Sequence, residues 1–186
     1  MQAERNRVPT LFVTGAPGSG KTALAKEVSE LLWRVREPHA VIDVDELCRG
    51  VLPGGPSDFN RSLALENLAA VWKNFSAAGF RRLILARVIQ SRDDLDLYAH
   101  AIPGCDLTVC RVAVEHSIVT TRLREREPGL AGVFLTTAAS ALDDVVVGLD
   151  LPGFVVENGD ERSITDLAFE VLDRIDWPRP SRDLLD

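Results

Sequence analysis

One eight-residue segment constrains this chain more than any other, because it matches the pattern G-x-x-x-x-G-K-[ST]. It lies between an apolar run, 10–14, and a helical pattern with apolar residues at 3.6-residue spacing, 21–35. Its glycines permit backbone conformations that turn successive N–H groups inward and form a nest for an anion. The segment reads Gly15-Ala16-Pro17-Gly18-Ser19-Gly20-Lys21-Thr22.

A strand, this loop and a helix N-terminus together predict a phosphate-binding site. Lys21 is expected to contact the β- and γ-phosphates of a nucleotide, and Thr22 is expected to offer its hydroxyl to Mg²⁺. We expect the nucleotide contacts to extend to Ala23, in the first turn of the helix.

The rest of the chain alternates short apolar runs with helical patterns. Strands are expected at 10–14, 40–42, 83–86, 107–110 and 154–156, and helices at 21–35, 58–78, 91–100, 114–127, 136–147 and 163–175. Repeated strand–helix order predicts right-handed crossovers and a mostly parallel sheet with helices on both faces. Ligands bind such sheets at the carboxyl ends of the strands, so functional side chains should directly follow strands.

Composition predicts one acidic domain that binds neither nucleic acids nor membranes. The 186 residues include 21 Lys and Arg and 28 Asp and Glu, for a formal net charge of −7. Nucleic acids and anionic membranes need clustered positive charge, so neither is expected as a partner. The first nine residues are polar and no stretch approaches the ~18 apolar residues of a membrane span, so a cytoplasmic protein is expected. The odd number of cysteines favours reduced thiols: Cys48, Cys105 and Cys110.

Two acids, Asp43 and Asp45, follow the second expected strand. Residues two apart on an extended segment point the same way. Two carboxylates beside a triphosphate suit Mg²⁺ coordination and deprotonation of an attacking hydroxyl. Asp45 can instead cap a short helix that starts at Glu46. Which acid is the base and which serves the metal stays open at this point.

Several arginines are expected at the same edge of the sheet. Arg122 and Arg126 are four apart on one helix face, where two guanidinium groups can stack on a base and stabilise transferring phosphoryl charge. The alternative is a solvated helix end. Arg87 and Arg111 follow the third and fourth expected strands. Burying an unpaired guanidinium is costly, so each pairs either with an acid or with a substrate anion.

A loop after the fifth expected strand reads Asn158-Gly159-Asp160. These residues are typical of a turn and need no function. In a phosphate-loop fold, the same loop passes the base of the nucleotide, so its backbone can contact adenine.

Taken together, GAPGSGKT, Asp-x-Asp, Arg-x-x-x-Arg and Asn-Gly-Asp resemble small P-loop kinases. This group includes shikimate, gluconate and adenylylsulfate kinases and chloramphenicol phosphotransferase. The resemblance covers about residues 10–176 and is closest to uncharacterised actinobacterial "AAA family ATPase" proteins. It implies a P-loop NTPase three-layer αβα sandwich with a five-stranded parallel sheet in order 2-3-1-4-5, and ATP and Mg²⁺ as cofactors.

The resemblance also implies roles for particular segments. One kinase domain covers residues 10–176, with a polar arm before it at 1–9 and a tail after it at 177–186. Within the domain, an acceptor segment is expected at about 46–78 and a short lid at about 122–135. Arg122 would stack on adenine, together with the loop of Asn158 and Gly159, and Arg126 would reach the phosphates. Polar candidates in the acceptor segment are Arg49, Asn60, Arg61 and Asn67.

Two features depart from the family pattern. Shikimate kinase has a glycine triplet after its third strand, where this chain has Ala86-Arg87-Val88, which argues against shikimate. The third strand also carries no acid for the metal, so Mg²⁺ must rely on Thr22 and the aspartate pair.

The expected function is transfer of the γ-phosphoryl group of ATP to a hydroxyl of a small molecule, by a monomer or homodimer. The alternatives are a slow ATPase or regulatory module without an acceptor, and a nucleotide or nucleoside kinase. The expected catalytic residues are Lys21, Asp43, Asp45 and Arg126; the metal ligands are Thr22 and Asp43; the substrate-binding residues are Asp45, Arg49, Arg61 and Arg87.

Overall fold

The computed structural model describes residues 7–50, 53, 60–126, 139 and 141–184, with only the main chain described at 124, 126 and 184. Five strands form one sheet in the order β2-β3-β1-β4-β5, and every neighbouring pair is parallel. This confirms the expected order. The strands are β1 (Val8–Thr14), β2 (His39–Asp43), β3 (Arg82–Ala86), β4 (Cys105–Ala113) and β5 (Phe154–Glu157).

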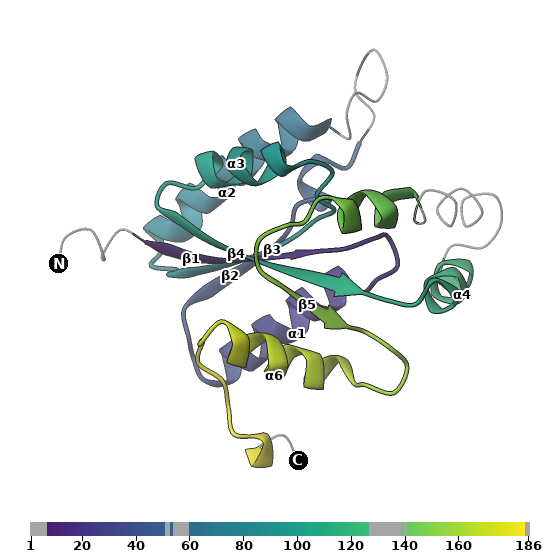
Figure 1. Cartoon of the computed structure of the whole chain (residues 1–186). Helices are drawn as coiled ribbons and strands as arrows, with labels where there is room; N and C mark the ends of the chain where they lie inside the picture. The colour runs from purple at the N-terminus through teal and green to yellow at the C-terminus, as the bar shows by residue number, and fades with distance from the viewer. Residues whose placement is uncertain (1–6, 51–52, 54–59, 127–138, 140, 185–186) are drawn as a thin grey trace.

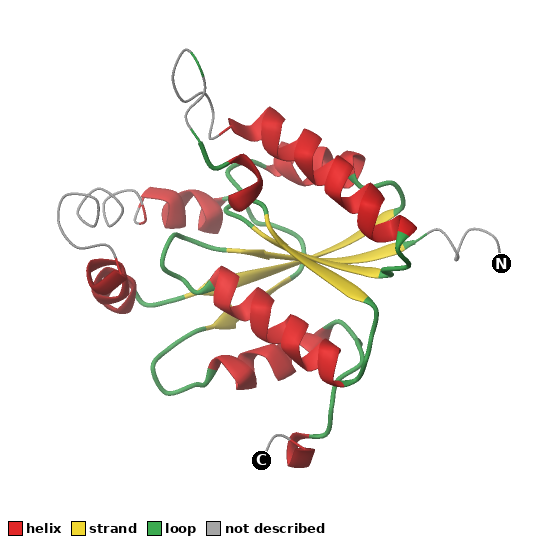
Figure 2. Cartoon of the chain, turned by 180° about the vertical axis from the view of Figure 1, so that it is seen from behind, coloured by secondary structure: helices red, strands yellow, loops and turns green. Residues whose placement is uncertain are grey.

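Helices cover both faces of this sheet (Figures 1 and 2), which confirms the three-layer sandwich. One face carries α1 (Lys21–Arg34) and α6 (Ile164–Arg174), and the other carries α2 (Arg61–Ala77) and α3 (Arg92–Ala101). Helix α4 (His116–Arg126) follows β4, and residues 141–148 are helical. The elements η2 (Glu46–Cys48) and η4 (Arg182–Leu184) are short 3-10 helices.

The sheet separates two hydrophobic cores. On the central strand β1, Leu11 and Val13 belong to the core under α1 and α6, whereas Phe12 belongs to the core under α2 and α3. Strand residues buried on both faces explain why this run shows no polar alternation. Trp72 on α2 is only 3% exposed and packs in the second core.

Strand β4 is longer than its apolar run suggests. It continues to Ala113, so Arg111 lies within the strand, in register with Thr14 on β1 and Val155 on β5. Hydrogen bonding to a neighbour on each side extends the strand past its apolar residues. At the other end of the sheet, β1 begins at Val8, two residues before the expected start.

The segment expected as a tail packs against the domain. Trp177 contacts the core under α1 and α6, and the Arg82 guanidinium lies 5.3 Å from the centroid of its ring. Arg179 and Arg182 lie 5.5 and 4.5 Å from the ring centroid of Phe169 on α6, and Phe169 is fully buried. Cation–π contacts and apolar packing therefore hold this segment on the helix layer.

None of the helices in the described ranges is long and apolar enough to cross a membrane. All three cysteines are free thiols.

Candidate active site

The phosphate loop joins β1 to α1, and its glycines adopt backbone conformations that other residues rarely do. Gly15 has φ 144° and Gly20, the residue before α1, has φ 96°. A Cβ atom at Gly15 would lie 2.5 Å from the carbonyl oxygen of Val112 on β4. Lys21 is 9% exposed, and its Nζ donates a hydrogen bond to the Ala16 carbonyl at 2.9 Å. The lysine ammonium is therefore held against the loop in which a phosphate would bind.

Asn158 supports this loop from the carboxyl end of β5. Its side chain is buried, and its Nδ2 donates to the Ser19 carbonyl at 2.7 Å. Its own N–H donates to the Ala113 carbonyl at 2.8 Å. A Cβ atom at Gly20 would lie 2.5 Å from Nδ2 of Asn158, so the glycine makes room for this contact. The Asn158 side chain thus fixes the loop, a role that the turn pattern did not indicate, and adenine contact by the backbone stays a prediction.

Arg122 lies beside the phosphate loop on α4. Its Nη1 donates to the Asn158 carbonyl at 3.4 Å, and its Nη2 is 3.2 Å from Oδ1 of Asp160. The guanidinium is therefore bound to the loop after β5 rather than only solvated. It lines a cavity of about 230 Å³ together with Gly18, Gly20, Lys21, Thr22, Ala23 and Leu123. The side chain of Arg126 and residues 127–135 of the expected lid lie outside the described residues.

Asp43 connects the phosphate loop to the segment after β2. Its Oδ2 accepts a hydrogen bond from the Thr22 hydroxyl at 2.7 Å, and its Oδ1 accepts one from the Asp45 N–H at 3.1 Å. Among the described residues, no group of three or more His, Cys, Asp and Glu side chains is placed to hold a metal. One hydroxyl and one carboxylate fit Mg²⁺, which usually takes its other ligands from phosphates and water.

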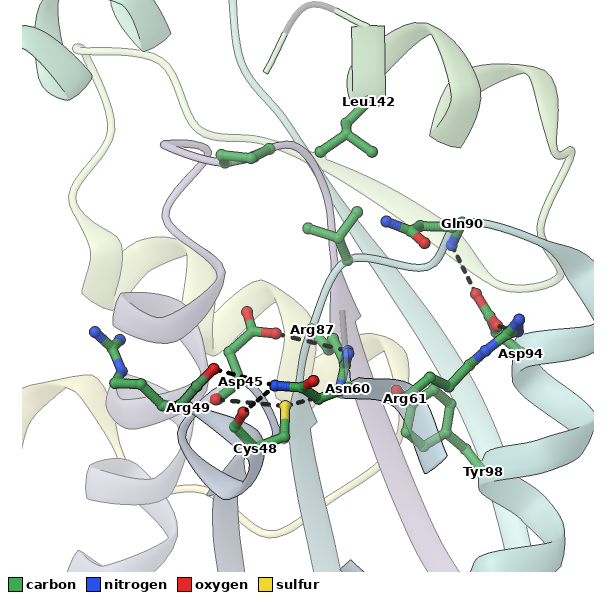
Figure 3. Close-up of a pocket in the computed structure, with 13 residues that line it drawn as sticks. Asp45, Cys48, Arg49, Asn60, Arg61, Arg87, Gln90, Asp94, Tyr98 and Leu142 are labelled. Atoms are coloured by element: carbon green, nitrogen blue, oxygen red, sulfur yellow. Dashed lines mark hydrogen bonds and ion pairs between the residues drawn. The ribbon is translucent and has the colours of Figure 1, made fainter. Parts of the chain in front are cut away.

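Asp45 precedes η2, but its side chain makes no capping hydrogen bond to this helix. It lies instead 3.6 Å, Oδ1 to Nε, from Arg87, whose side chain is 7% exposed (Figure 3). Arg87 thus pairs with an acid, which was one of its two expected partners. Partial burial raises the pKa of the Asp45 carboxyl above its usual value; Arg87 opposes this rise and the nearby Asp43 adds to it.

Next to Asp45 lies a cavity of about 380 Å³, which we call the acceptor cavity. It is bounded by η2, the start of α2, the segment after β3, and α3, and Pro17 of the phosphate loop also lines it. The structure brings all four expected substrate-binding residues to this cavity: Asp45, Arg49, Arg61 and Arg87. It adds residues that we did not select from the sequence, namely Cys48, Gln90, Asp94, Tyr98 and Leu142.

Asp94 holds Arg61 at the edge of the acceptor cavity. Asp94 is 5% exposed, and its Oδ2 accepts hydrogen bonds from the N–H groups of Gln90 and Ser91 at 2.8 and 3.0 Å. Its Oδ1 lies 2.6 Å from Nη1 of Arg61, on the neighbouring helix. Ser91 and Asp94 form a capping box at the start of α3. The S-x-x-D spacing was therefore the signal in the sequence that could have identified this acid.

The two expected asparagines differ in position. Asn60 lines the acceptor cavity, and its Nδ2 donates to the Cys48 carbonyl at 2.9 Å. Asn67 donates from Nδ2 to the Leu47 carbonyl at 2.6 Å, so it supports η2 and is not among the residues that line the cavity.

The expectation that Arg111 joins the other cations is wrong. Arg111 lines a separate cavity of about 150 Å³ with residues of the 146–155 segment. The reason is the length of β4, which places Arg111 inside the sheet instead of after it.

The sheet order, the phosphate loop and the adjacent acidic pair define a P-loop kinase fold. A family model described as adenylylsulphate kinase matches residues 7–122, which is more than half of the chain. The chain therefore belongs to the adenylylsulphate kinase family, and it is a P-loop kinase, a phosphotransferase that binds ATP. No curated protein matches the chain. Closeness to the actinobacterial "AAA family ATPase" proteins stays a prediction.

Several solved structures share the fold. A Deinococcus radiodurans tunicamycin resistance protein is 18% identical, with a TM-score of 0.64 over 94% of this chain and 99% of that one. A gluconokinase from Sinorhizobium meliloti 1021 is 19% identical, with a TM-score of 0.59 over 92% and 94%. The Mycobacterium tuberculosis APS kinase in complex with AMPPNP and APS is 24% identical, with a TM-score of 0.57 over 92% and 99%.

Proposed function

We propose that this kinase transfers the γ-phosphoryl group of Mg-ATP to a hydroxyl group of a small molecule bound in the acceptor cavity. The observation that carries this proposal is the position of Asp45. Its side chain lines the acceptor cavity, while its N–H donates to Asp43, which in turn accepts from Thr22 of the phosphate loop. A chain of two hydrogen bonds therefore links the acceptor side to the nucleotide side.

We propose different roles for the two acids. Asp43 is bound to Thr22 and lies on the metal side, so we assign Thr22 and Asp43 to Mg²⁺. Bound Mg²⁺ supplies positive charge that neutralises the transferring phosphoryl group. Lys21 and the N–H groups of the loop hold the phosphates, and we expect Arg126 to add charge there.

Asp45 then serves the acceptor. Its carboxylate accepts the proton of the substrate hydroxyl as the hydroxyl oxygen bonds to the γ-phosphorus and the bond to the ADP oxygen breaks. A raised pKa brings this base closer to the operating pH and makes it more effective. Arg87 keeps the carboxylate oriented toward the cavity through their ion pair.

The test is ADP release from Mg-ATP in the presence of a panel of hydroxyl compounds. The panel should include adenylyl sulfate, gluconate, tunicamycin and nucleosides, because the acceptor itself is not identified. One stimulating compound supports the kinase and names its acceptor, and a nucleoside as that compound identifies a nucleoside kinase. Slow release that no compound changes favours the module without an acceptor.

Variants then test the mechanism. With the stimulating compound, Asp45→Asn should lower turnover by about 10²- to 10⁴-fold and leave ATP affinity unchanged. Asp43→Asn should raise the Mg²⁺ concentration needed for half-maximal rate. Asp96→Asn, an exposed carboxylate on α3, is the matched control and should change neither quantity. Full turnover in both Asp43→Asn and Asp45→Asn would falsify the mechanism.

A further inference from the structure

A second cavity, of about 690 Å³, lies at the amino ends of the strands. We call it the distal cavity. Its walls come from the start of β1, the second half of α2, the end of α3 and the segments that enter β3 and β4. In Figure 1 this is the end of the sheet beside the N-terminus, whereas the phosphate loop follows the opposite end of β1. Seven strand residues span about 23 Å, so the distal cavity is well separated from the active site.

The inner wall of the distal cavity is apolar. It includes Val8, Trp72 and Phe80, and Trp72 also belongs to the core under α2 and α3. The volume falls within the range of about 300–1,000 Å³ that is typical of small-molecule sites, which are mostly lined by apolar and aromatic side chains. The wall therefore fits the apolar body of an organic ligand.

The lining of the distal cavity also includes positively charged side chains. Four basic side chains line the distal cavity, and none of its described lining residues is acidic, although the chain has a net charge of −7. Arg7 pairs with Asp106 at 2.8 Å, and Nδ1 of His100 lies 2.6 Å from the carbonyl oxygen of Asp96. The other two are Lys73 and Arg81, whose side chains form no hydrogen bond or ion pair with any described residue.

Lys73 and Arg81 are exposed, and helix capping does not explain their positions. A basic side chain in the last turn of a helix is a common end-of-helix feature, and His100 lies in the last turn of α3. Lys73 lies four residues before the end of α2, and Arg81 lies outside any helix, so the helix dipole does not account for them. Lys73 is also one of only three lysines in the chain.

We propose that the distal cavity binds a small organic anion, an apolar body that carries a carboxylate, sulfonate or phosphate group. The apolar body contacts Trp72 and Phe80, and the anionic group pairs with Lys73 and Arg81. A polyanion or an anionic membrane would meet the negative charge of the rest of the molecule, whereas a small anion meets only the local cations. The site is separate from those of ATP and the acceptor.

The test uses two dyes of similar shape on the full chain. The anionic dye is 8-anilinonaphthalene-1-sulfonate, and the neutral dye is N-phenyl-1-naphthylamine; both fluoresce on transfer to an apolar site. We expect the anionic dye to bind at one site, more tightly than the neutral dye, and with unchanged affinity when Mg-ATP is saturating. Displacement by Mg-ATP, or equal affinity for both dyes, would overturn the proposal.

Variants locate the site. Lys73→Glu with Arg81→Glu should weaken the anionic dye by about tenfold or more, since two charge contacts become repulsive. Lys26→Glu with Arg34→Glu changes the net charge equally at exposed positions on α1 and should leave affinity within about twofold. Ser76→Phe keeps every charge but fills the cavity, so it should weaken both dyes.

Near-ultraviolet circular dichroism should first show that each variant is folded. The remaining outcomes then also test the proposed anion site. Equal losses in the two charge-reversed pairs would assign binding to net charge and overturn the site. Unchanged binding of both dyes in Ser76→Phe would overturn it as well. Strong binding of a poly-glutamate peptide without binding of the anionic dye would replace the small anion with an acidic segment of a partner.

Discussion

The hydrogen bond between Asn158 and the phosphate loop leads to a testable prediction. It distinguishes whether the Asn158 side chain supports the loop or recognises the nucleotide base. Asn158→Ala removes the hydrogen bond from Nδ2 to the Ser19 carbonyl, which is 2.7 Å long, and leaves that buried acceptor without this donor. Leaving a buried polar group unsatisfied costs about 1–3 kcal/mol. If this free-energy cost is fully expressed in nucleotide binding, ATP affinity falls by about five- to 150-fold. Asn158→Asp should cost more, because a carboxylate oxygen would then face a carbonyl oxygen.

The assay compares Mg-ATP with inorganic tripolyphosphate, measured by titration calorimetry. Tripolyphosphate has phosphates but no base, so a loss through the loop should weaken both ligands by the same factor. Asp160→Ala is the control: it leaves the Asn158 side chain in place and removes only the exposed pair between Asp160 and Arg122, which is worth about 0.2–1 kcal/mol. If Asn158→Ala weakened ATP but left tripolyphosphate unchanged, the side chain would act on the base and our reading of the loop would be refuted.

Three further predictions concern stability and pH. Gly153→Ala should lower the free energy of unfolding, measured in urea, by at least about 2 kcal/mol, because φ at Gly153 is +124° and a Cβ atom there would lie 2.0 Å from the Val109 carbonyl oxygen. Gly148→Ala is the control and should cost little, because the space around Gly148 is open. Equal losses in the two variants would contradict the argument. Leu68→Ala, at a fully buried position, should cost about 2–5 kcal/mol with an unchanged denaturant slope, and a loss below about 1 kcal/mol would mean that the second core is not packed as described. Asp45 acts as a base only when it is a carboxylate, and burial raises its pKa above the ordinary 3.8. As the pH is lowered, kcat/KM should therefore begin to fall at a higher pH than it would with an ordinary carboxyl group. Asp45→Asn should not show this acidic decrease in kcat/KM, and a decrease that persists in the variant would assign it to another group.

Most of the fold was predictable because its signals are local. The glycines of the phosphate loop identify the turn between β1 and α1, and uninterrupted apolar runs such as Leu11-Phe12-Val13 identify strands that are buried on both faces. Asp45 and Arg87 were found because both follow strands, and parallel strands place their carboxyl ends at one edge.

The contacts that the sequence did not predict join residues that are distant in sequence. Asn158 meets Ser19 across 139 positions, and Asp94 meets Arg61 across 33, and neither local pattern names its partner. Arg111 was misplaced because the length of β4 depends on hydrogen bonds to two neighbouring strands and not on its own apolar residues.

The two cores on opposite faces of the sheet give the enzyme separable halves. The phosphate loop leads into α1, whose core lies under α1 and α6, whereas much of the acceptor cavity is built from η2, α2 and α3, over the other core. Substitutions at residues that line the acceptor cavity can therefore change the cavity and leave the packing of α1 and α6 intact. In the kinase that we propose, acceptor choice can then diverge while the nucleotide site stays constant. An engineer who wants a new acceptor should accordingly vary residues that line the cavity, such as Arg49 and Arg61, and keep core residues such as Leu68.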